Sequence, residues 1–394
     1  MAETTVRRVV SRERAAGDIW LLGICLALLG AGLIMVLSAS QVYSLETTGS
    51  PFNIFFHQVA YAALGLVGLV VASRIDYHRL RHWALPAFVV TMLLMLAVLI
   101  PHVGVQAYGA SRWLNVPGVP FQLQPSEVAK LTVAIFLASW MSKRTRSLDS
   151  FVDGFLPYAM LMAAVITLLA LQKDLGTLIV TTVLMVAVYY AGGGRKRYLF
   201  LLGAAAVVAM GGLIAVERYR LERVATFLNP FADPTNTTLQ AYQGLVALGS
   251  GGLTGVGLGH SIEKYQWLPE APTDFIFAII GEETGLIGAT LIILGFVLFT
   301  IRGYRASMRA PDRFGVALAA AITTWIAVQA FINIGVVTAS LPVTGVPLPF
   351  ISYGGTALVM TLIGVGVLLN ISAQGSRPSL NGGRRWRPRR GTGS

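Results

Sequence analysis

The sequence predicts an all-α polytopic membrane protein with about ten transmembrane helices and a large extracytoplasmic loop between helices 7 and 8. Of its 394 residues, 55% are hydrophobic and only 12% are charged, which is too apolar for a soluble globular chain. Apolar runs long enough to cross a bilayer recur along the chain, and basic residues alternate between the segments that separate them. Together these observations indicate many membrane spans.

The predicted spans divide the chain into three parts. We expect a basic cytoplasmic N-terminal segment at 1–17, a ten-helix membrane domain at 18–372 and a basic disordered cytoplasmic tail at 373–394. The first span follows basic residues as a secretion signal would, but nine spans come after it, so we expect an uncleaved anchor. The ten runs lie at 18–38, 56–73, 83–101, 126–141, 154–171, 176–192, 197–215, 275–301, 315–339 and 354–372.

Charge predicts the orientation. Of the 30 lysines and arginines, 23 fall in the N-terminal segment and in every second segment after it, which the positive-inside rule assigns to the cytoplasm. Both termini are therefore expected in the cytoplasm. The net charge of +12 could suggest nucleic acid, but no zinc-finger or helix-turn-helix pattern supports that partner. The outward segments are 39–55, 102–125, 172–175, 216–274 and 340–353.

Several chemistries are excluded by missing residues. Cys25 is the single cysteine, so neither an intramolecular disulfide nor a thiolate metal cluster can form. The sequence has no Walker A, H-E-x-x-H or G-x-S-x-G pattern, which removes the corresponding ATPase, zinc protease and serine hydrolase functions. Gly255, Gly257 and Gly259 are spaced as in a nucleotide loop, but they follow no parallel strand and lie on the outer side, so we reject that reading.

Three acids stand in the stretch LPEAPTDFIFAIIGEETGLIG. Asp274 is expected at the outer mouth of the eighth helix, where it could cap the helix N-terminus or, if partly buried, act as a base with a raised pKa. Glu282 and Glu283 are expected about two turns inside that helix, too far from Asp274 for a carboxylate pair. Structural hydrogen bonding is the favoured role for these two glutamates.

Other charged groups on the outer side are few. Glu127 and Lys130 are spaced i, i+3 on one helix and can pair, while Asp174 shares a short turn with Lys173. Arg112 belongs to another outward segment. Arginine and lysine can bind a phosphate or diphosphate, although anchoring to headgroups or interhelical salt bridges would use the same residues. An outward polar site of this kind suits a substrate with a phosphate and a lipid tail.

Six motifs resemble the SEDS family (shape, elongation, division and sporulation), in order and over nearly all of 18–372. The Gly-Glu-Glu at 281–283 and the basic N-terminal segment are more similar to the FtsW branch than to the RodA branch. The motifs are GASRW, QPSEVAKL, FLNPFADP, YQGLVALGSGGLTGVGLG, LPEAPTDFIFAIIGEETGLIG and PVTGVPLPFISYGGTAL.

The resemblance implies a peptidoglycan glycosyltransferase that polymerises lipid II into undecaprenyl-diphosphate-linked glycan at the outer face of the bacterial inner membrane, for septal wall synthesis. It implies a divalent cation (Mg or Mn), no nucleotide, and partners that include a class B penicillin-binding protein, other divisome proteins and membrane lipids, but no nucleic acid. Asp274 corresponds to the essential acid. The expected substrate-binding residues are Arg112, Glu127, Lys130, Asp174, Arg223, Gln243 and Ser352; no metal ligand is assigned.

Two positions depart from the family pattern. Lys173 replaces a usual proline, which puts a cation beside Asp174, and Pro272 replaces a usual histidine. We hypothesise that Asp274 takes the proton of the acceptor hydroxyl while cations neutralise the leaving diphosphate, giving direct displacement with inversion. A lipid II flippase, an elongation-specific polymerase and a module that only recruits the transpeptidase are the alternatives.

Overall fold

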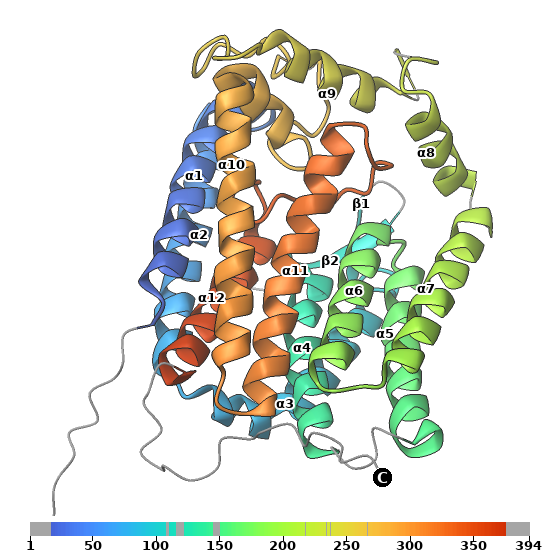
Figure 1. Ribbon diagram of the computed structural model, residues 1–394. Helices are drawn as coiled ribbons and strands as arrows, with labels where there is room; N and C mark the ends of the chain where they lie inside the picture. The colour runs from blue at the N-terminus through green and yellow to red at the C-terminus, as the bar shows by residue number, and fades with distance from the viewer. Residues whose placement is uncertain are drawn as a thin grey trace, which may run out of the picture.

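The computed structural model describes residues 17–107, 110–115, 122–144, 150–216, 218–233, 235–236, 238–265 and 267–375. Nearly all of the predicted N-terminal segment and most of the predicted C-terminal tail lie outside these residues. The described chain forms an upright bundle of long helices, with α8 and α9 at its upper end (Figure 1). The long helices are α1 Ile19–Thr48, α2 Asn53–Arg74, α3 Leu80–Ala97, α4 Pro125–Lys143, α5 Leu156–Leu171, α6 Leu175–Ala191, α7 Lys196–Val216, α10 Ile276–Arg309, α11 Arg313–Val337 and α12 Gly355–Gly375.

The helical polytopic fold is confirmed. Each of the ten predicted apolar runs overlaps one of these helices. Among the described residues, seven helical stretches are long and apolar enough to cross a membrane, and α6 is a shorter apolar helix. Helices α4 and α7 cover the other two runs. The number of ten spans stays a prediction.

Helix α11 lies at the centre of the bundle, where it packs against α10, α6 and α4. Its side chains are buried on nearly every side, including the whole of Trp325. Four small residues of α11, Ala317, Ala319, Ala320 and Ala321, are buried; small side chains let helix backbones approach closely. This buried helix also carries polar side chains to the upper half of the protein, where the functional site is found.

Helix α10 is interrupted at Gly285, which has φ 66° and ψ −168°. Only glycine adopts this conformation readily. The glycine-rich stretch closes the break: Val256 N donates to Glu282 O at 3.0 Å, and Leu286 N donates to Gly252 O at 2.9 Å. Gly251 and Gly255 allow this close approach, because a Cβ at either position would collide with the backbone of α10 at Gly281 or Glu283.

The paired acids lie about two turns inside α10, as predicted, but the helix is interrupted just after them. Glu282 and Glu283 precede Gly285, so they do not lie inside one continuous membrane helix. Ser261 Oγ donates to Glu282 Oε2 and Ile262 N to Glu282 Oε1 at 2.8 Å, while Glu283 Oε1 accepts a 2.6 Å bond from Ser38 Oγ of α1. The favoured structural hydrogen-bonding role of the two glutamates is confirmed, and they fasten the 251–264 loop to α10 and α1.

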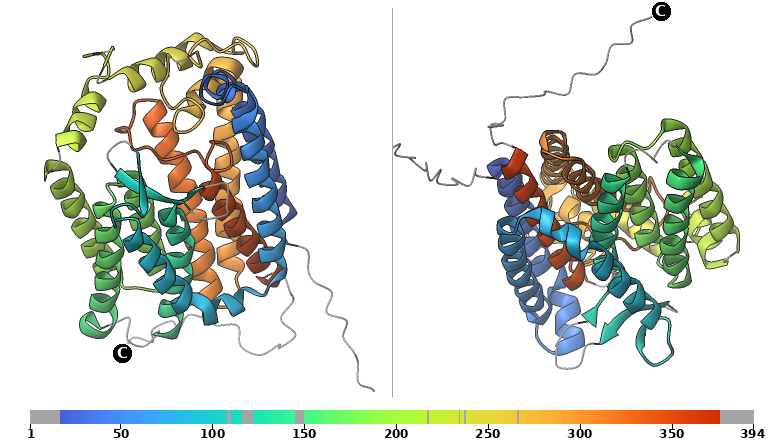
Figure 2. Two further views of the ribbon diagram at one scale, coloured as in Figure 1. Left: turned by 180° about the vertical axis from the view of Figure 1, so that it is seen from behind. Right: turned by 90° about the horizontal axis from the view of Figure 1, so that it is seen from below.

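A small sheet, absent from the sequence prediction, lies in the outward segment 102–125. Its strands are β1 Gly104–Ala107, β2 Ala110–Asn115 and β3 Gln122–Leu123, antiparallel in the order β1-β2-β3. It lies about half-way up the molecule, at one side of the bundle (Figure 2). The segment 216–274 forms two further short helices, α8 Arg218–Leu228 and α9 Leu239–Ser250.

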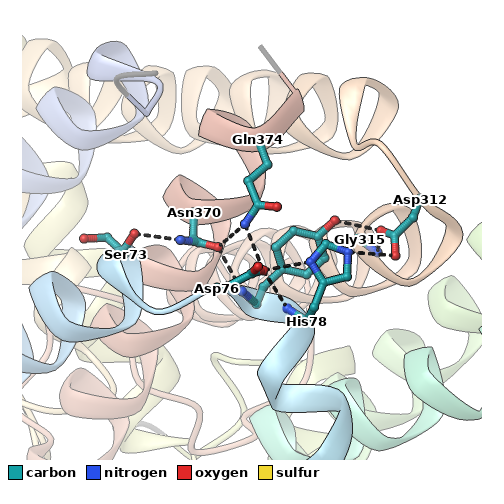
Figure 3. A network of polar contacts seen from close by, with 8 residues as sticks. Ser73, Asp76, His78, Asp312, Gly315, Asn370 and Gln374 are labelled. Carbon is teal, nitrogen blue, oxygen red and sulfur yellow. Dashed lines mark hydrogen bonds and ion pairs between the residues drawn. The ribbon is translucent and has the colours of Figure 1, made fainter. Parts of the chain in front are cut away.

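A polar network joins three segments at the lower end of the bundle (Figure 3). His78 Nδ1 lies 2.7 Å from Asp76 Oδ1, and His78 Nε2 lies 3.3 Å from Asp312 Oδ2. Gln374 Nε2 donates at 3.0 Å both to Asp76 Oδ1 and to Asn370 Oδ1. The α2–α3 connection, the α10–α11 connection and the end of α12, all predicted to share one side of the membrane, thus lie together.

Candidate active site

The upper half of the protein contains a cavity of about 950 Å³. Four of the five segments predicted to face outward line it, together with α2, so segments far apart in sequence converge there. Its lining mixes cations, acids, amides and hydroxyls. The polar lining residues are His57, Tyr61, Arg112, Gln122, Gln124, Glu127, Lys173, Asp174, Thr177, Arg223, Gln240, Glu270, Thr273, Asp274, Thr344, Tyr353 and Thr356.

Asp274 is half-buried in the wall of this cavity. Loss of water around the carboxyl raises its pKa to about 7, and the negative charge of Glu270 adds to the rise, while Arg223 and Arg112 partly oppose it. A carboxyl with this pKa is divided between its two protonation states near neutral pH, which suits a general base.

The alternative role of Asp274 as a helix cap is wrong. Helix α10 begins at Ile276, its N-cap residue is Phe275, and no side chain caps it. Thr273 N and Phe275 N both donate to Glu270 O at 3.2 Å, so the chain makes a turn through Asp274 before the helix starts. This turn leaves the carboxylate beside the cavity.

Three cationic residues line the same cavity. Arg112 Nη2 on β2 donates to Lys173 O at 2.6 Å, and Lys173 holds a left-handed turn with φ 56°. Arg223 of α8 donates from Nη1 to Val343 O at 2.7 Å, which joins α8 to the loop after α11. Guanidinium groups carry further donors for an anionic substrate.

Two further acids of the cavity, Asp174 and Glu127, are held in place by contacts with the protein. Asp174 is the N-cap of α6: its Oδ1 accepts from Thr177 N at 3.1 Å, and its Oδ2 accepts from Ser126 Oγ at 3.3 Å. Glu127 forms an ion pair with Lys130 at 2.7 Å, as the i, i+3 spacing predicts. Glu127 Oε2 is buried and has no hydrogen-bond partner in the described residues.

Comparisons with known proteins give the family. The model of the cell cycle protein family that includes FtsW, RodA and SpoVE matches residues 19–377. The chain belongs to this family. A protein of Geobacter metallireducens named probable peptidoglycan glycosyltransferase FtsW is 41% identical over 357 residues, covering 91% of this chain and 95% of that protein. Stage V sporulation protein E of Bacillus subtilis is 39% identical over 363 residues, covering 92% and 99%.

Solved structures agree with this family membership. A chain from a peptidoglycan synthase complex, whose structure concerns the coordination of polymerization and crosslinking, aligns with a TM-score of 0.72 and 26% identity over 91% of this chain and 98% of that one. The rod shape determining protein RodA of Thermus thermophilus aligns with a TM-score of 0.67 and 26% identity over 92% and 99%. The chain is a multi-pass membrane protein of the FtsW/RodA/SpoVE family.

In this family member, five of the eight predicted site residues line the cavity: Asp274, Arg112, Glu127, Asp174 and Arg223. Three do not. Lys130 lies behind Glu127, 1% exposed; Ser352 Oγ accepts from Leu348 N at 2.7 Å and so shapes the loop. Gln243 lies on α9, where Gln240 is the glutamine that lines the cavity.

Sequence reasoning missed Glu270, although it lies four residues before Asp274 in the stretch that carried the prediction. Glu270 has a left-handed backbone, φ 58°, and its Oε2 accepts a 2.7 Å bond from Thr273 Oγ1. An acid flanked by Pro269 and preceding a second acid by four residues was a signal available in the sequence. No signal in the sequence indicated the turn that brings Glu270 and Asp274 to one cavity.

The described part of the chain offers no ready site for the expected divalent cation. Among the residues that the structure describes, no group of three or more histidine, cysteine, aspartate or glutamate side chains is arranged to hold a metal ion. Two of the cavity acids, Asp174 and Glu127, are engaged with protein donors. The described acids therefore do not form a metal site of the protein's own.

Proposed function

We propose that this FtsW/RodA/SpoVE family member is a peptidoglycan glycosyltransferase that polymerises lipid II. The observation that carries the proposal is the half-buried carboxyl of Asp274, with a pKa of about 7, in one cavity with Arg112 and Arg223. The relatives named as peptidoglycan glycosyltransferases cover nearly the whole chain, which supports the same activity. The cavity therefore combines a base with anion-binding groups.

The chemistry follows from this pairing. The 4-hydroxyl of the acceptor N-acetylglucosamine is a weak nucleophile, and Asp274 accepts its proton as the oxygen attacks the anomeric carbon of the donor. The donor diphosphate leaves, and Arg112, Arg223 and Lys173 stabilise the charge that develops on it. The bond to the leaving diphosphate carries the activation, so no nucleotide is needed. One base without a carboxylate nucleophile gives inversion.

A divalent cation remains part of the proposal through the resemblance alone. Bound to the diphosphate of the substrate, it would supply charge neutralisation of the leaving group. Glu270 and Asp174 are the two acids that act electrostatically on Asp274, and both raise its pKa. Removal of divalent cations by a chelator is therefore expected to lower activity by weakening substrate binding, without lowering the thermal stability of the protein.

The biological setting is proposed from the family and from charge. We infer that the protein works in septal wall synthesis at the bacterial inner membrane, with both termini in the cytoplasm and the cavity on the outer side. A class B penicillin-binding protein and other divisome proteins are the proposed partners. The structural likeness to a chain of a peptidoglycan synthase complex supports a crosslinking partner. A fluorescent fusion that labels the side wall instead of the septum would favour an elongation role.

The test is a polymerisation assay with purified protein, lipid II, a divalent cation and no nucleotide, with and without the proposed partner. Asp274→Asn is expected to abolish glycan polymer. Asp153→Asn is the matched control, because Asp153 is exposed and does not line the cavity. Full activity of Asp274→Asn would overturn the base assignment, and absence of polymer from the parent protein with its partner would favour a flippase or a recruitment role.

A further inference from the structure

Asn333 of α11 joins two segments that meet at the active site. Its side chain is 1% exposed, and its Nδ2 donates to Asp274 O at 2.7 Å and to Val346 O at 2.8 Å. One buried amide thus holds the backbone of the proposed base and the backbone of the loop between α11 and α12. No charged partner is involved.

The loop that Asn333 holds has no regular hydrogen bonding of its own. Residues 342–348 form neither helix nor strand, and buried backbone carbonyls need donors from elsewhere. Gln329, one turn earlier on α11, donates from Nε2 to Pro347 O at 2.9 Å. Two amides of the central helix therefore bind the carbonyls of consecutive loop residues.

The loop passes close to the carboxylate of Asp274. Gly345 has φ 73°, and a Cβ at that position would lie 3.3 Å from Asp274 Oδ2. Tyr353 N donates to Pro272 O at 2.9 Å, which makes a second link between the loop and the turn that carries Asp274. A shift of the loop would change both the position of the carboxylate and the space around it.

The polar atoms of Asn333 are used unevenly. Both described bonds come from Nδ2, while Oδ1 is buried without a partner. An unpartnered buried acceptor is unfavourable, so packing alone does not explain why an amide occupies this position. The two bonds that its Nδ2 group donates do explain it. Resting on the proposed function, we propose that Asn333 is a positioning residue that holds Asp274 at the reacting hydroxyl through its backbone.

Gln329 is a poorer place to test this idea than Asn333. Its Oε1 also accepts from Lys130 Nζ at 2.8 Å and from Trp325 Nε1 at 2.8 Å. A change at Gln329 would therefore disturb the buried Glu127–Lys130 pair as well. Asn333 binds only backbone carbonyls among the described contacts, so its substitution isolates the positioning effect.

The experiment compares kcat and KM for lipid II polymerisation between Asn333→Leu and the parent. Leucine has a similar volume and no donor. We expect kcat to fall about 10- to 100-fold, since small misplacement of a catalytic group has this effect, with KM changed less than about twofold. Asn333→Ser, which keeps one donor, should fall between the two and serves if the leucine variant does not fold.

The pH profile gives a second readout. The charged groups that act on Asp274 are Glu270 in its own turn, Arg223 of α8, Arg112 of β2 and Asp174 at the start of α6. Release of the turn exposes the carboxyl to water, so the midpoint of the kcat profile should move to lower pH. A purely structural role would leave this midpoint in place.

Asn370→Leu is the matched control for a lost buried amide. Asn370 Nδ2 donates to Ser73 O at 2.8 Å at the opposite end of the bundle (Figure 3), so it should lower thermal stability without changing kcat or the pH midpoint. If Asn333→Leu keeps the parental kcat and midpoint while Asp274→Asn is inactive, the positioning role is overturned and the proposed function stands. If Asn333→Leu and Asn370→Leu lose activity alike, the role is structural and the proposal also fails.

Discussion

Glu127 and Lys130 form an ion pair in which Glu127 Oε1 and Lys130 Nζ lie 2.7 Å apart. Both side chains are at most 2% exposed. Lys130 Nζ also donates to Gln329 Oε1 at 2.8 Å and lies 5.1 Å from the ring centre of Trp325. Both residues belong to α4, and the bond from Lys130 to Gln329 connects the pair with α11 beside the cavity that Glu127 lines. Removal of one partner would leave the other as an uncompensated buried charge.

Lys130→Met is therefore expected to lower stability by about 3–5 kcal/mol through the unpaired Glu127 carboxylate. The measurement is the thermal unfolding midpoint of the purified protein in detergent. The double variant Glu127→Gln with Lys130→Met removes both charges and should recover most of the loss. Equal midpoints for the single and the double variant would show that charge pairing is not the cause.

The pKa of Asp274 predicts how activity depends on pH. The proposed base must be unprotonated, and burial together with Glu270 raises its pKa to about 7, so kcat/KM should rise as pH increases through about 7. Glu270→Gln removes the negative neighbour, which favours the charged carboxylate, and the midpoint should move to lower pH. Asp153→Asn is again the control. A midpoint near 4, or one unmoved by Glu270→Gln, would contradict this electrostatic account.

The sequence was sufficient to predict features of the site that depend on local helical spacing or on membrane topology. Helical spacing predicted the Glu127–Lys130 pair. Alternation of basic segments predicted five outward segments, and four of them line the cavity. It could not predict that Ser352 binds Leu348 N, because this bond depends on the path of an irregular loop. Nor could it tell Gln240 from Gln243, since the orientation of a short helix over the cavity is set by tertiary packing.

The raised pKa of Glu263, which lies outside the active site, predicts that the stability of the folded protein depends on pH. Burial, with the charge of nearby Glu282, raises the pKa of Glu263 to about 7 from an ordinary 4.5. The folded protein then binds a proton that the unfolded chain releases, so stability should decrease as pH rises from about 4.5 to 7. Glu263→Gln should remove this loss and stabilise the protein by about 1–3 kcal/mol at pH 8, with little effect at pH 4.5. Thermal midpoints at both pH values test this, and equal effects at the two would contradict it.

The backbone conformation of Gly285 predicts that a side chain at this position destabilises the protein. Its φ of 66° and ψ of −168° are unfavourable for alanine, and a Cβ there would lie 2.4 Å from Gly255 N. Gly285→Ala should therefore destabilise the protein by more than about 1 kcal/mol and loosen the 251–264 loop from α10. Gly203→Ala in α7 is the matched control, because nothing lies within 4 Å of its Cβ position; alanine there should leave stability unchanged or raise it by up to about 1 kcal/mol. Thermal midpoints and proteolysis of the 251–264 loop measure the two effects, and similar behaviour of the two variants would mean that the break at Gly285 imposes no strain on alanine.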